Sequence, residues 1–442
     1  MRNLLHSRRG SAAFATVIAL VPLIGVVALG AEAGSWYVTH QHAQNAADAA
    51  AYSGALRLAC TIAGAGGAGC DTSVDYHGKE FAAQNAFWNS GDTTAYPGTI
   101  GAPSLPSGIS HAVQIAIGDY DDNAGTFTTP AAGNGNAVRA RVSQQQPAYL
   151  AAVLGLTTVN IPAQAIAAIR NPTKLCALAL GPDVGALKLA GSLSNNGTGC
   201  GLMSDSTVQL ASTPAFTGSG WAVYGSSGCT PSGTCSAVSV PHNYFMPYAL
   251  DPLQDLKTAS FNSTTGSSQA CGKKTITNGI TCNLTPLSTA FGDLTVNSGG
   301  TLNLQAGTYF FYNASVNLGG TVTGTGVTLV LLGSSSLSIN GGGVKLSAPT
   351  GPRTPTSPLN GVLIDDQATG AVNINGNGAV QLGGAMYFPN TGVSFGGTAQ
   401  PTNTTCSEVI AKTLTMSGGA YLSTQGCAQA TIARSQVVTL VQ

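Results

Sequence analysis

The chain has 442 residues, of which 43% are hydrophobic and only 8% are charged, and its formal net charge is zero. Soluble proteins average about 25% charged residues. Phosphate backbones are recognised by Lys/Arg-rich surfaces, and no such block occurs here beyond the N-terminal arginines, so no nucleic-acid partner is expected. The hydrophobic content also excludes a disordered chain.

The first predicted element is a membrane-spanning helix. Residues Ser11 to Ala31 are free of charged side chains. At ~1.5 Å per residue, this run covers about 30 Å, the thickness of a bilayer's hydrocarbon core. Arg2, Arg8 and Arg9 precede it and predict a cytoplasmic N-terminus with the bulk of the chain on the far side. Residues 1–35 are therefore interpreted as a cytoplasmic tip and a single transmembrane helix.

A cleaved signal peptide is the alternative interpretation of this run. Ala31-Glu32-Ala33 fits a small-x-small cleavage site. However, a signal peptide's apolar region usually has ~7 to 15 residues, and this run is longer. Its helical pattern also continues beyond the apolar residues. We therefore favour the uncleaved anchor, in which Pro22 lies within the span.

The helix is expected to continue beyond the membrane. Trp36 and Tyr37 are aromatics of the kind found at the headgroup level, and an alanine-dense stretch follows from Thr39 to Leu58. Its small residues recur at spacings of three and four, which gives a flat face suited to close helix contact. Asn45, Ala47 and Asp48 are the candidate contact residues. The alternative is a solvated stalk.

These segments carry a resemblance to a known family. Arg8-Arg9-Gly10-Ser11, the apolar span, Gly34-Ser35-Trp36-Tyr37 and Gln44-Asn45-Ala46-Ala47-Asp48 follow one another in the order seen in TadG-like proteins. That family belongs to the tight-adherence (Flp) pilus assembly systems of bacteria. The resemblance implies a bacterial inner-membrane location, a bulk that is periplasmic or extracellular, and partners among other pilus-assembly proteins. Ala15 stands where related minor pilins carry a glutamate, which argues against prepilin-type cleavage at Gly10.

Residues 36–170 are interpreted as the TadG-like helix followed by an α+β region. A helix is predicted first, then two strands with period-two alternation, a short helix and a closing strand. These expected elements are residues 73–89, 111–117, 136–142, 147–156 and 159–169. Two strands packed against the N-terminal helix are the expected arrangement.

A segment between the predicted strands superficially resembles a calcium-binding loop. It reads Asp119-Tyr120-Asp121-Asp122-Asn123-Ala124-Gly125. Its glycine comes one position late and no glutamate closes the site downstream, so a turn that connects two strands is favoured. No metal or cofactor is expected in this chain.

Ten cysteines lie beyond the membrane span, an even number that favours disulfides in an oxidising compartment. Sequence alone does not fix their connectivity, and pairing between neighbours is the simplest hypothesis. Zinc binding is disfavoured, because no Cys-x-x-Cys occurs and no histidine stands at ligand spacing beside them. The neighbouring pairs are Cys60 with Cys70, Cys176 with Cys200, Cys229 with Cys235, Cys271 with Cys282, and Cys406 with Cys427.

Residues 172–442, beyond the boundary at Pro172, are predicted to form an all-β domain, a parallel β-helix or solenoid. Glycine pairs recur at 299–300, 319–320 and 341–342, a period of about 21 residues that matches three short strands and three tight turns. Asn, Ser and Thr are expected to stack in ladders, and Val327 to Leu332 to be deeply buried. The expected strands are 301–304, 315–318, 337–340, 371–374 and 380–382.

The same region resembles the C-terminal part of TadG-related proteins that lack a von Willebrand-type module. The order of several short segments carries this resemblance, which implies a role in pilus assembly or in the cell envelope. They are Leu175-Cys176-Ala177-Leu178, Gly199-Cys200-Gly201, Ala306-Gly307-Thr308-Tyr309, Gly324-Thr325-Gly326-Val327-Thr328, Gly384-Ala385-Met386-Tyr387-Phe388-Pro389-Asn390, Cys406 with Ile410-Ala411, and Cys427.

Catalysis is the competing function class, because parallel β-helices often bind or cleave polysaccharides. Asp365-Asp366 offers two carboxylates, as a glycosidase requires. Successive side chains of a strand face opposite sides, so at most one of the two would face a groove unless the backbone turns there. Asp-Asp followed by Gln-Ala-Thr-Gly is typical of a polar turn, so the doublet is interpreted as structural. Gly218-Ser219-Gly220 lacks the spacing of a nucleophile elbow. We therefore expect a structural or accessory protein that is not an enzyme, with an envelope-anchored polysaccharide-binding or polysaccharide-cleaving protein as the alternative.

Overall fold

The computed structural model describes residues 8–63, 73–97, 104–129, 135–195, 199–259, 261, 268–341 and 343–442. Arg2, Cys70 and Gly342 lie outside the described residues. The chain divides into two compact units. One comprises Met1–Leu58, Asp71–Arg170 and Val438–Gln442, and the other comprises Ala59–Cys70 and Asn171–Val437.

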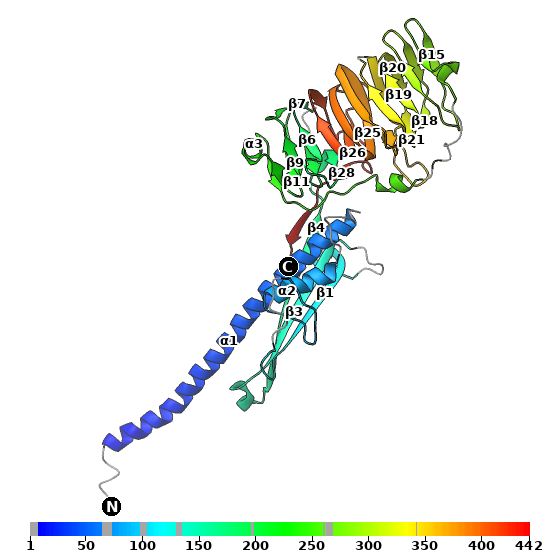
Figure 1. The fold of residues 1–442 in the computed structure, drawn as a ribbon. Helices are drawn as coiled ribbons and strands as arrows, with labels where there is room; N and C mark the ends of the chain where they lie inside the picture. Colours follow the sequence, from blue (N-terminus) through cyan, green and yellow to red (C-terminus); the bar gives the residue numbers. More distant parts are fainter. Residues whose placement is uncertain are drawn as a thin grey trace, which may run out of the picture. The chain divides into compact units, whose positions relative to one another are not determined.

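A single helix of 55 residues, α1 (Arg8–Ile62), opens the first unit (Figure 1). It contains the whole apolar run and continues without interruption through the alanine-dense stretch, so the prediction of one continuous helix is confirmed. Pro22 lies inside it. A proline in a helix removes one backbone hydrogen bond, and α1 continues on both sides of it.

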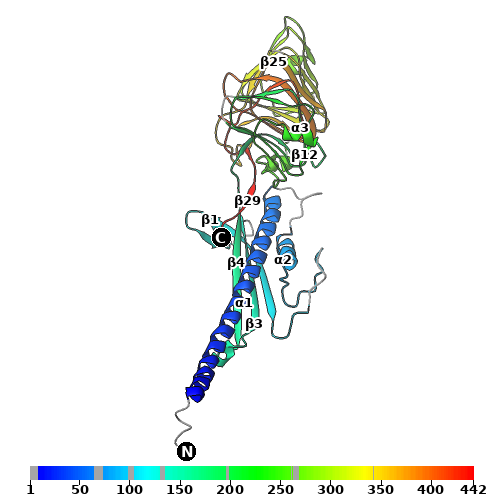
Figure 2. The same ribbon diagram turned by 90° about the vertical axis from the view of Figure 1, so that its left-hand side faces the viewer.

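The C-terminal half of α1 packs on a β-sheet of the same unit (Figure 2). Its contact face consists of small residues spaced three and four apart, all fully buried: Ala43, Ala46, Ala47, Ala50, Ala51 and Ala55. A Cβ placed on Gly54 would lie 3.0 Å from Cγ1 of Val138, which shows how closely helix and sheet approach. At the other end of the contact, the Gln44 side-chain amide donates to the carbonyl of Gln164 at 3.1 Å.

The sheet of the first unit has five strands in the order β2-β1-β3-β4-β29. Strands β1 and β3 pair antiparallel, as do β3 and β4, and the short helices α2 and η1 (a 3-10 helix) complete the unit. The bounds are α2 (Val74–Gln84), β1 (Ser110–Asp121), β2 (Thr126–Thr128), β3 (Ala137–Pro147), η1 (Ala151–Leu154), β4 (Thr158–Arg170) and β29 (Val437–Leu440). The predicted α+β arrangement is present, with two strands more than the sequence indicated.

The acidic segment between β1 and β2 is a hairpin turn. Oδ1 of Asp121 accepts hydrogen bonds from the backbone N–H groups of Asn123 at 2.8 Å and Ala124 at 3.3 Å. The aspartate is thereby used in closing the turn, which is the usual role of Asp at this position.

Strand β29 departs from the predicted division of the chain, which assigned all residues after Pro172 to the solenoid. It instead joins the edge of the N-terminal sheet beside β4. The N–H of Val441 donates to the carbonyl of Ile166 at 2.9 Å, and the N–H of Ile166 donates to the carbonyl of Gln442 at 2.8 Å. An open sheet edge presents unpaired backbone groups, and β29 satisfies those of β4.

The second unit is a parallel β-solenoid of about ten turns, as predicted. Three walls of parallel strands surround one apolar core. The first wall contains β5 (Lys174–Ala179), β8 (Cys200–Ser204), β11 (Trp221–Gly225), β13 (His242–Tyr244), β18 (Gly307–Tyr312), β21 (Val327–Leu332) and β24 (Val362–Asp366). The second contains β6 (Leu187–Leu189), β9 (Val208–Leu210), β12 (Cys229–Thr230), β14 (Thr275–Ile276), β16 (Leu294–Val296), β19 (Ser315–Leu318) and β22 (Ser336–Ile339).

The third wall contains β15 (Thr281–Leu284), β17 (Thr301–Leu304), β20 (Thr321–Thr325) and β23 (Gly343–Ser347). On the same side of the coil, a separate sheet is formed by β7 (Ser192–Ser194), β10 (Ala215–Thr217) and β27 (Gly419–Tyr421). The long strands β25 (Val372–Ala399) and β26 (Ser407–Met416) turn corners and contribute to more than one wall. The remaining elements are β28 (Ala433–Arg434), α3 (Ser232–Ser236) and the 3-10 helices η2 (Gln254–Thr258) and η3 (Ala270–Gly272).

The predicted period of about 21 residues is the length of one solenoid turn, because residues one period apart stack on each other. Thr301 lies beside Thr321 in register, one turn further along the chain. At the corner, a Cβ on Gly320 would come within 2.6 Å of the carbonyl oxygen of Gly300, so only glycine fits. The predicted polar ladder is also present, because the Asn303 amide donates to Oδ1 of Asn283 at 2.8 Å and Thr323 donates to Oδ1 of Asn303 at 2.9 Å. All six residues of β21 are buried.

The turns do not stack in chain order. The chain enters at β5 and winds through β8 and β11 to β13, at one end of the stack. It resumes at the opposite end, near Ser268 and β14, and winds back to β26, which pairs with β5. Figure 1 shows the green strands of the first block beside the orange and red strands of the second. The solenoid turn that begins with β5 therefore lies in the middle of the stack, between β8 and β26, and not at one end.

Residues 246–259, here named the crossing segment, form most of the described part of the link between the two blocks. The N–H of Ala249 donates to Oδ1 of Asp205 at 2.7 Å, and the hydroxyl of Tyr387 donates to Oδ2 of Asp251 at 2.9 Å. The Arg353 guanidinium donates to Asp255 at 2.7 Å. Apolar side chains of the segment cover the outer face of the first wall, among them Met246, Leu253 and Leu256. The solenoid is thus buried on both faces of this wall.

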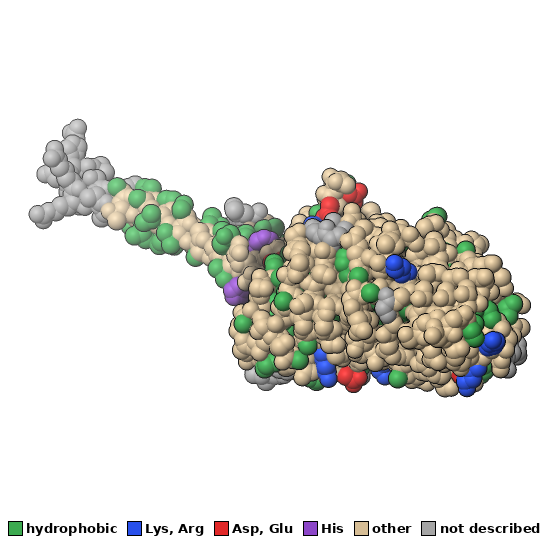
Figure 3. Space-filling model, turned by 90° about the horizontal axis from the view of Figure 1, so that it is seen from above, with side chains coloured by type: hydrophobic (Ala, Val, Ile, Leu, Met, Phe, Trp, Pro, Cys, Tyr) green, Lys and Arg blue, Asp and Glu red, His purple; other side chains and the backbone are tan. Residues whose placement is uncertain are grey.

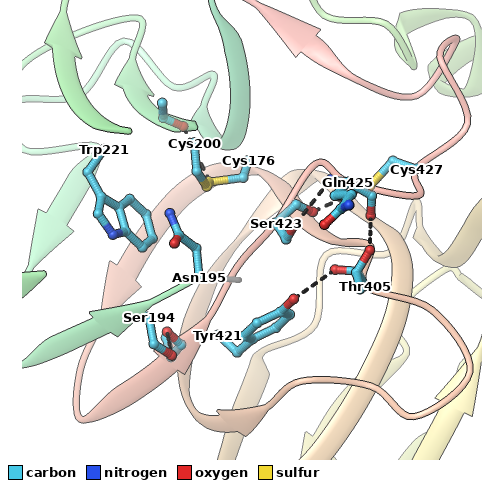
Figure 4. Close-up of a disulfide and its surroundings, with 12 residues drawn as sticks. Cys176, Ser194, Asn195, Cys200, Trp221, Thr405, Tyr421, Ser423, Gln425 and Cys427 are labelled. Atoms are coloured by element: carbon cyan, nitrogen blue, oxygen red, sulfur yellow. Dashed lines mark hydrogen bonds between the residues drawn. A yellow bond between two sulfur atoms is a disulfide. The ribbon is translucent and has the colours of Figure 1, made fainter. Parts of the chain in front are cut away.

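Four disulfides lie within the solenoid, each between cysteines that are neighbours in the sequence. Cys229–Cys235 and Cys271–Cys282 lie at the two ends of the stack. Cys176–Cys200 joins β5 to β8 (Figure 4), and Cys406–Cys427 joins the residue before β26 to the segment after β27. The predicted pairing of Cys60 with Cys70 involves a residue outside the described ones.

Candidate functional site

The first half of α1 exposes apolar side chains around its whole circumference. Val17, Leu23 and Val26 are 65%, 64% and 69% exposed, respectively. Figure 3 shows hydrophobic side chains gathered on this part of the helix. It is the one helix, among the described residues, that is long and apolar enough to cross a membrane. A helix that is hydrophobic all round is stable only when it is surrounded by apolar material, and the segment fits membrane anchoring.

The three candidate contact residues of α1 occupy different environments. Ala47 is fully buried against the sheet of its own unit. Asp48 is half-buried and accepts a hydrogen bond from the Gln44 side chain at 2.8 Å, and Asn45 is exposed. The small-residue face that includes Ala47 therefore packs within the protein, and partner contact by the three residues stays a prediction. Of the three, Asn45 has a side chain open to a partner.

The carboxylate of Glu32 connects α1 to the loop between β3 and β4. Its two oxygens accept hydrogen bonds from three consecutive backbone N–H groups, those of Tyr149 at 2.6 Å, Leu150 at 3.1 Å and Ala151 at 2.9 Å. Tyr149 and Leu150 precede η1 and Ala151 is its first residue, and the N–H groups at the start of a helix have no partner within the helix. From the sequence, Glu32 was expected only as part of a cleavage site, because nothing local links it to a loop more than a hundred residues later.

The Asp365–Asp366 doublet is not a polar turn, contrary to the prediction. Both residues end the buried strand β24, and both are 0% exposed. Oδ1 of Asp366 accepts a hydrogen bond from the N–H of Ala368 at 2.9 Å, and Asp365 accepts one from the Gln367 side chain. Burial raises the pKa of Asp365 to about 7 and that of Asp366 to about 8. The structure therefore buries both carboxylates within the first wall, where the local sequence indicated a polar turn.

Two further buried acids were missed by sequence reasoning. Burial raises the pKa of Asp205 to about 8, and it does the same for Glu408 in the apolar strand β26. Asp205 holds the crossing segment through the N–H of Ala249. Among the described residues, no three His, Cys, Asp or Glu side chains are grouped so that they could hold a metal ion.

Residues 10–57 match the family model described as Flp pilus-assembly TadE/G-like. The helix α1 carries a Tad domain. This match covers the exposed apolar segment and the part of α1 that packs on the sheet, and it bears out the TadG-like resemblance of this segment. A Tad domain supports involvement of the chain in Flp pilus assembly. No curated protein and no solved structure was found to match the chain.

Proposed function

We propose that the chain is a structural or accessory component of Flp pilus assembly that acts through protein contacts. The observation that carries the proposal is the coincidence of the TadE/G-like match with an exposed apolar helix. In this proposal α1 anchors the chain once in the bacterial inner membrane. The arginines remain in the cytoplasm, and both compact units lie in the periplasm or outside the cell.

The partners we propose are other pilus-assembly proteins of the inner membrane and periplasm. Disulfides support this location, because they persist in oxidising compartments. The solenoid supplies long walls of regularly spaced polar residues, such as the ladder of Asn283, Asn303 and Thr323, on a disulfide-stapled scaffold. Such a scaffold presents side chains in fixed positions along its length, which suits bracing or templating neighbouring proteins.

The alternative, an envelope-anchored polysaccharide-binding or polysaccharide-cleaving protein, is not favoured. A glycosidase needs two carboxyl groups that reach a substrate, and Asp365 and Asp366 are fully buried. A hollow of about 250 Å³ on the solenoid, next to Cys406 and Cys427, is lined by Gly, Ser, Thr, Ala, Pro and Asn and by this disulfide, with no acidic or basic side chain. These observations support the proposal of assembly contact rather than chemistry.

The experiment is a deletion of the gene with complementation by matched variants. Electron microscopy of the cell surface measures Flp pili, and fractionation measures membrane association. We expect the deletion to reduce pili and the intact chain to restore them. A version in which residues 11–31 are replaced by a cleavable signal peptide should be exported but should fail to restore pili. Normal pili in the deletion strain would contradict the proposal.

A further inference from the structure

The loop between β3 and β4 exposes large apolar side chains. Residues 148–157 read Ala-Tyr-Leu-Ala-Ala-Val-Leu-Gly-Leu-Thr and contain no charge. Tyr149 is 77% exposed, Leu150 40% and Leu156 45%. Single exposed apolar residues are ordinary on a protein surface. Several exposed apolar side chains on one short, uncharged loop indicate a surface that contacts another protein or a membrane.

The position of this loop along α1 is fixed by Glu32. Three backbone N–H groups of the loop donate to its carboxylate, and the N–H of Ala148 closes the loop by donating to the carbonyl of Thr157 at 3.0 Å. Glu32 directly follows the apolar run that ends at Ala31, and Trp36 lies about one helical turn further on. The loop is therefore held at the level where the apolar part of α1 ends (Figures 1 and 2).

We propose that the loop inserts Tyr149, Leu150 and Leu156 into the headgroup region of the same lipid bilayer that α1 crosses. This inference rests on the proposed membrane anchoring. Tyrosine is favoured at that depth because its ring is apolar and its hydroxyl reaches water. Backbone N–H groups are costly to bring near hydrocarbon unless they are paired, and Glu32 pairs three of them. The second contact fixes the orientation of the N-terminal unit against the membrane.

The test is photo-crosslinking of the full chain in liposomes of phosphatidylethanolamine and phosphatidylglycerol that contain an alkyne-tagged phospholipid. The photoreactive phenylalanine analogue p-benzoylphenylalanine replaces Tyr149. Two matched positions on α1 serve as references: Ile24, which is 57% exposed in the apolar run, and Tyr52, which is 42% exposed and about 30 Å beyond Glu32 along the helix. We expect lipid labelling at 149 within about threefold of that at 24 and at least about tenfold above that at 52.

The outcomes separate this inference from the proposed function. Labelling at 24 without labelling at 149 overturns the inference and leaves the anchor in place. No labelling at either position overturns the membrane anchoring itself. Crosslinking of position 149 to a protein from native membranes instead of to lipid also overturns the inference.

The role of Glu32 has a separate readout. Glu32→Ala frees the loop, so labelling at 149 should fall at least about threefold while labelling at 24 is unchanged. Equal labelling at 149 in this variant would show that Glu32 does not position the loop.

Discussion

Val409 in β26 lies directly beside Ala177 in β5, in parallel register, although one belongs to the last turn that the chain makes and the other to the first. Leu414 and Leu187 continue the same pairing on the next wall. This junction is held by backbone hydrogen bonds and apolar packing, and the disulfides Cys176–Cys200 and Cys406–Cys427 staple the turns on its two sides. The solenoid is thus one continuous stack made from two blocks of sequence.

The first prediction concerns Cys406→Ser. Loss of the Cys406–Cys427 disulfide should lower the free energy of unfolding by about 2 to 4 kcal/mol, because the unfolded chain regains conformational entropy. Thermal unfolding of the detergent-solubilised full chain measures the change, and the double variant Cys406→Ser/Cys427→Ser is the control for effects of a lone thiol. Native protein should contain no free thiols without reductant. Alkylation of all ten cysteines in native material would contradict the assignment.

The second prediction concerns membrane topology. A reporter that is active only outside the cytoplasm should work when it is fused after Gln442, and the protein should stay in the membrane fraction after alkaline extraction. Both results follow from an uncleaved apolar helix preceded by arginines. A soluble product that begins at Glu32 or Ser35 would instead establish signal-peptide cleavage.

The third prediction separates packing within the protein from partner contact on α1. Ala47→Leu should destabilise the N-terminal unit by about 1 to 3 kcal/mol, because Ala47 is fully buried and a larger side chain must displace its packed neighbours. Asn45→Leu should change stability by less than about 0.5 kcal/mol, since Asn45 is exposed. Asn45→Trp should nevertheless impair pilus assembly if this side of α1 contacts a partner. Normal pili in a folded Asn45→Trp strain would remove this position from the interface.

The fourth prediction is a loss of stability with rising pH. The folded-state pKa values of Asp365 and Asp366, about 7 and about 8, exceed the ordinary value of 3.8. These two groups therefore hold more protons in the folded protein than in the unfolded chain between about pH 4 and pH 8, so their contribution to stability falls across that window as pH rises. At pH 8 the variant Asp365→Asn/Asp366→Asn should melt at a higher temperature than the wild type, because its amide side chains carry no charge in the buried strand. At pH 4 the difference should vanish. A difference in melting temperature between variant and wild type that stays the same from pH 4 to pH 8 would show that these acids ionise normally.

The fifth prediction uses the same double variant in cells. Because neither carboxylate reaches the surface, Asp365→Asn/Asp366→Asn should assemble pili and support adherence at wild-type levels. Electron microscopy and a surface-adherence assay measure this. Loss of function in a variant that remains folded would favour the polysaccharide-directed alternative.

Local periodicity explains which features could be predicted. The apolar run of α1 and the glycine pairs near Gly300 and Gly320 are patterns that repeat over short stretches of sequence. They predicted the helix and the β-solenoid. The order of the turns, the return of β29 to β4, and the contact of Glu32 with Tyr149 depend on residues far apart in sequence. The burial of Asp365 depends on its place within the first wall, where the local sequence indicated a polar turn.

The crossing segment also determines when the protein can finish folding. Synthesis runs from β5 toward β26, so the first block of turns exists for some time with the β5 edge unpaired. An open parallel edge rich in apolar residues is a site of aggregation until it is covered. The natural cover, β26, is made only after the second block has been wound from the far end. A chain whose synthesis stops before residue 407 would therefore lack β26 and leave the edge of β5 unpaired. A quality-control protease would find such incomplete chains locally unfolded at this edge.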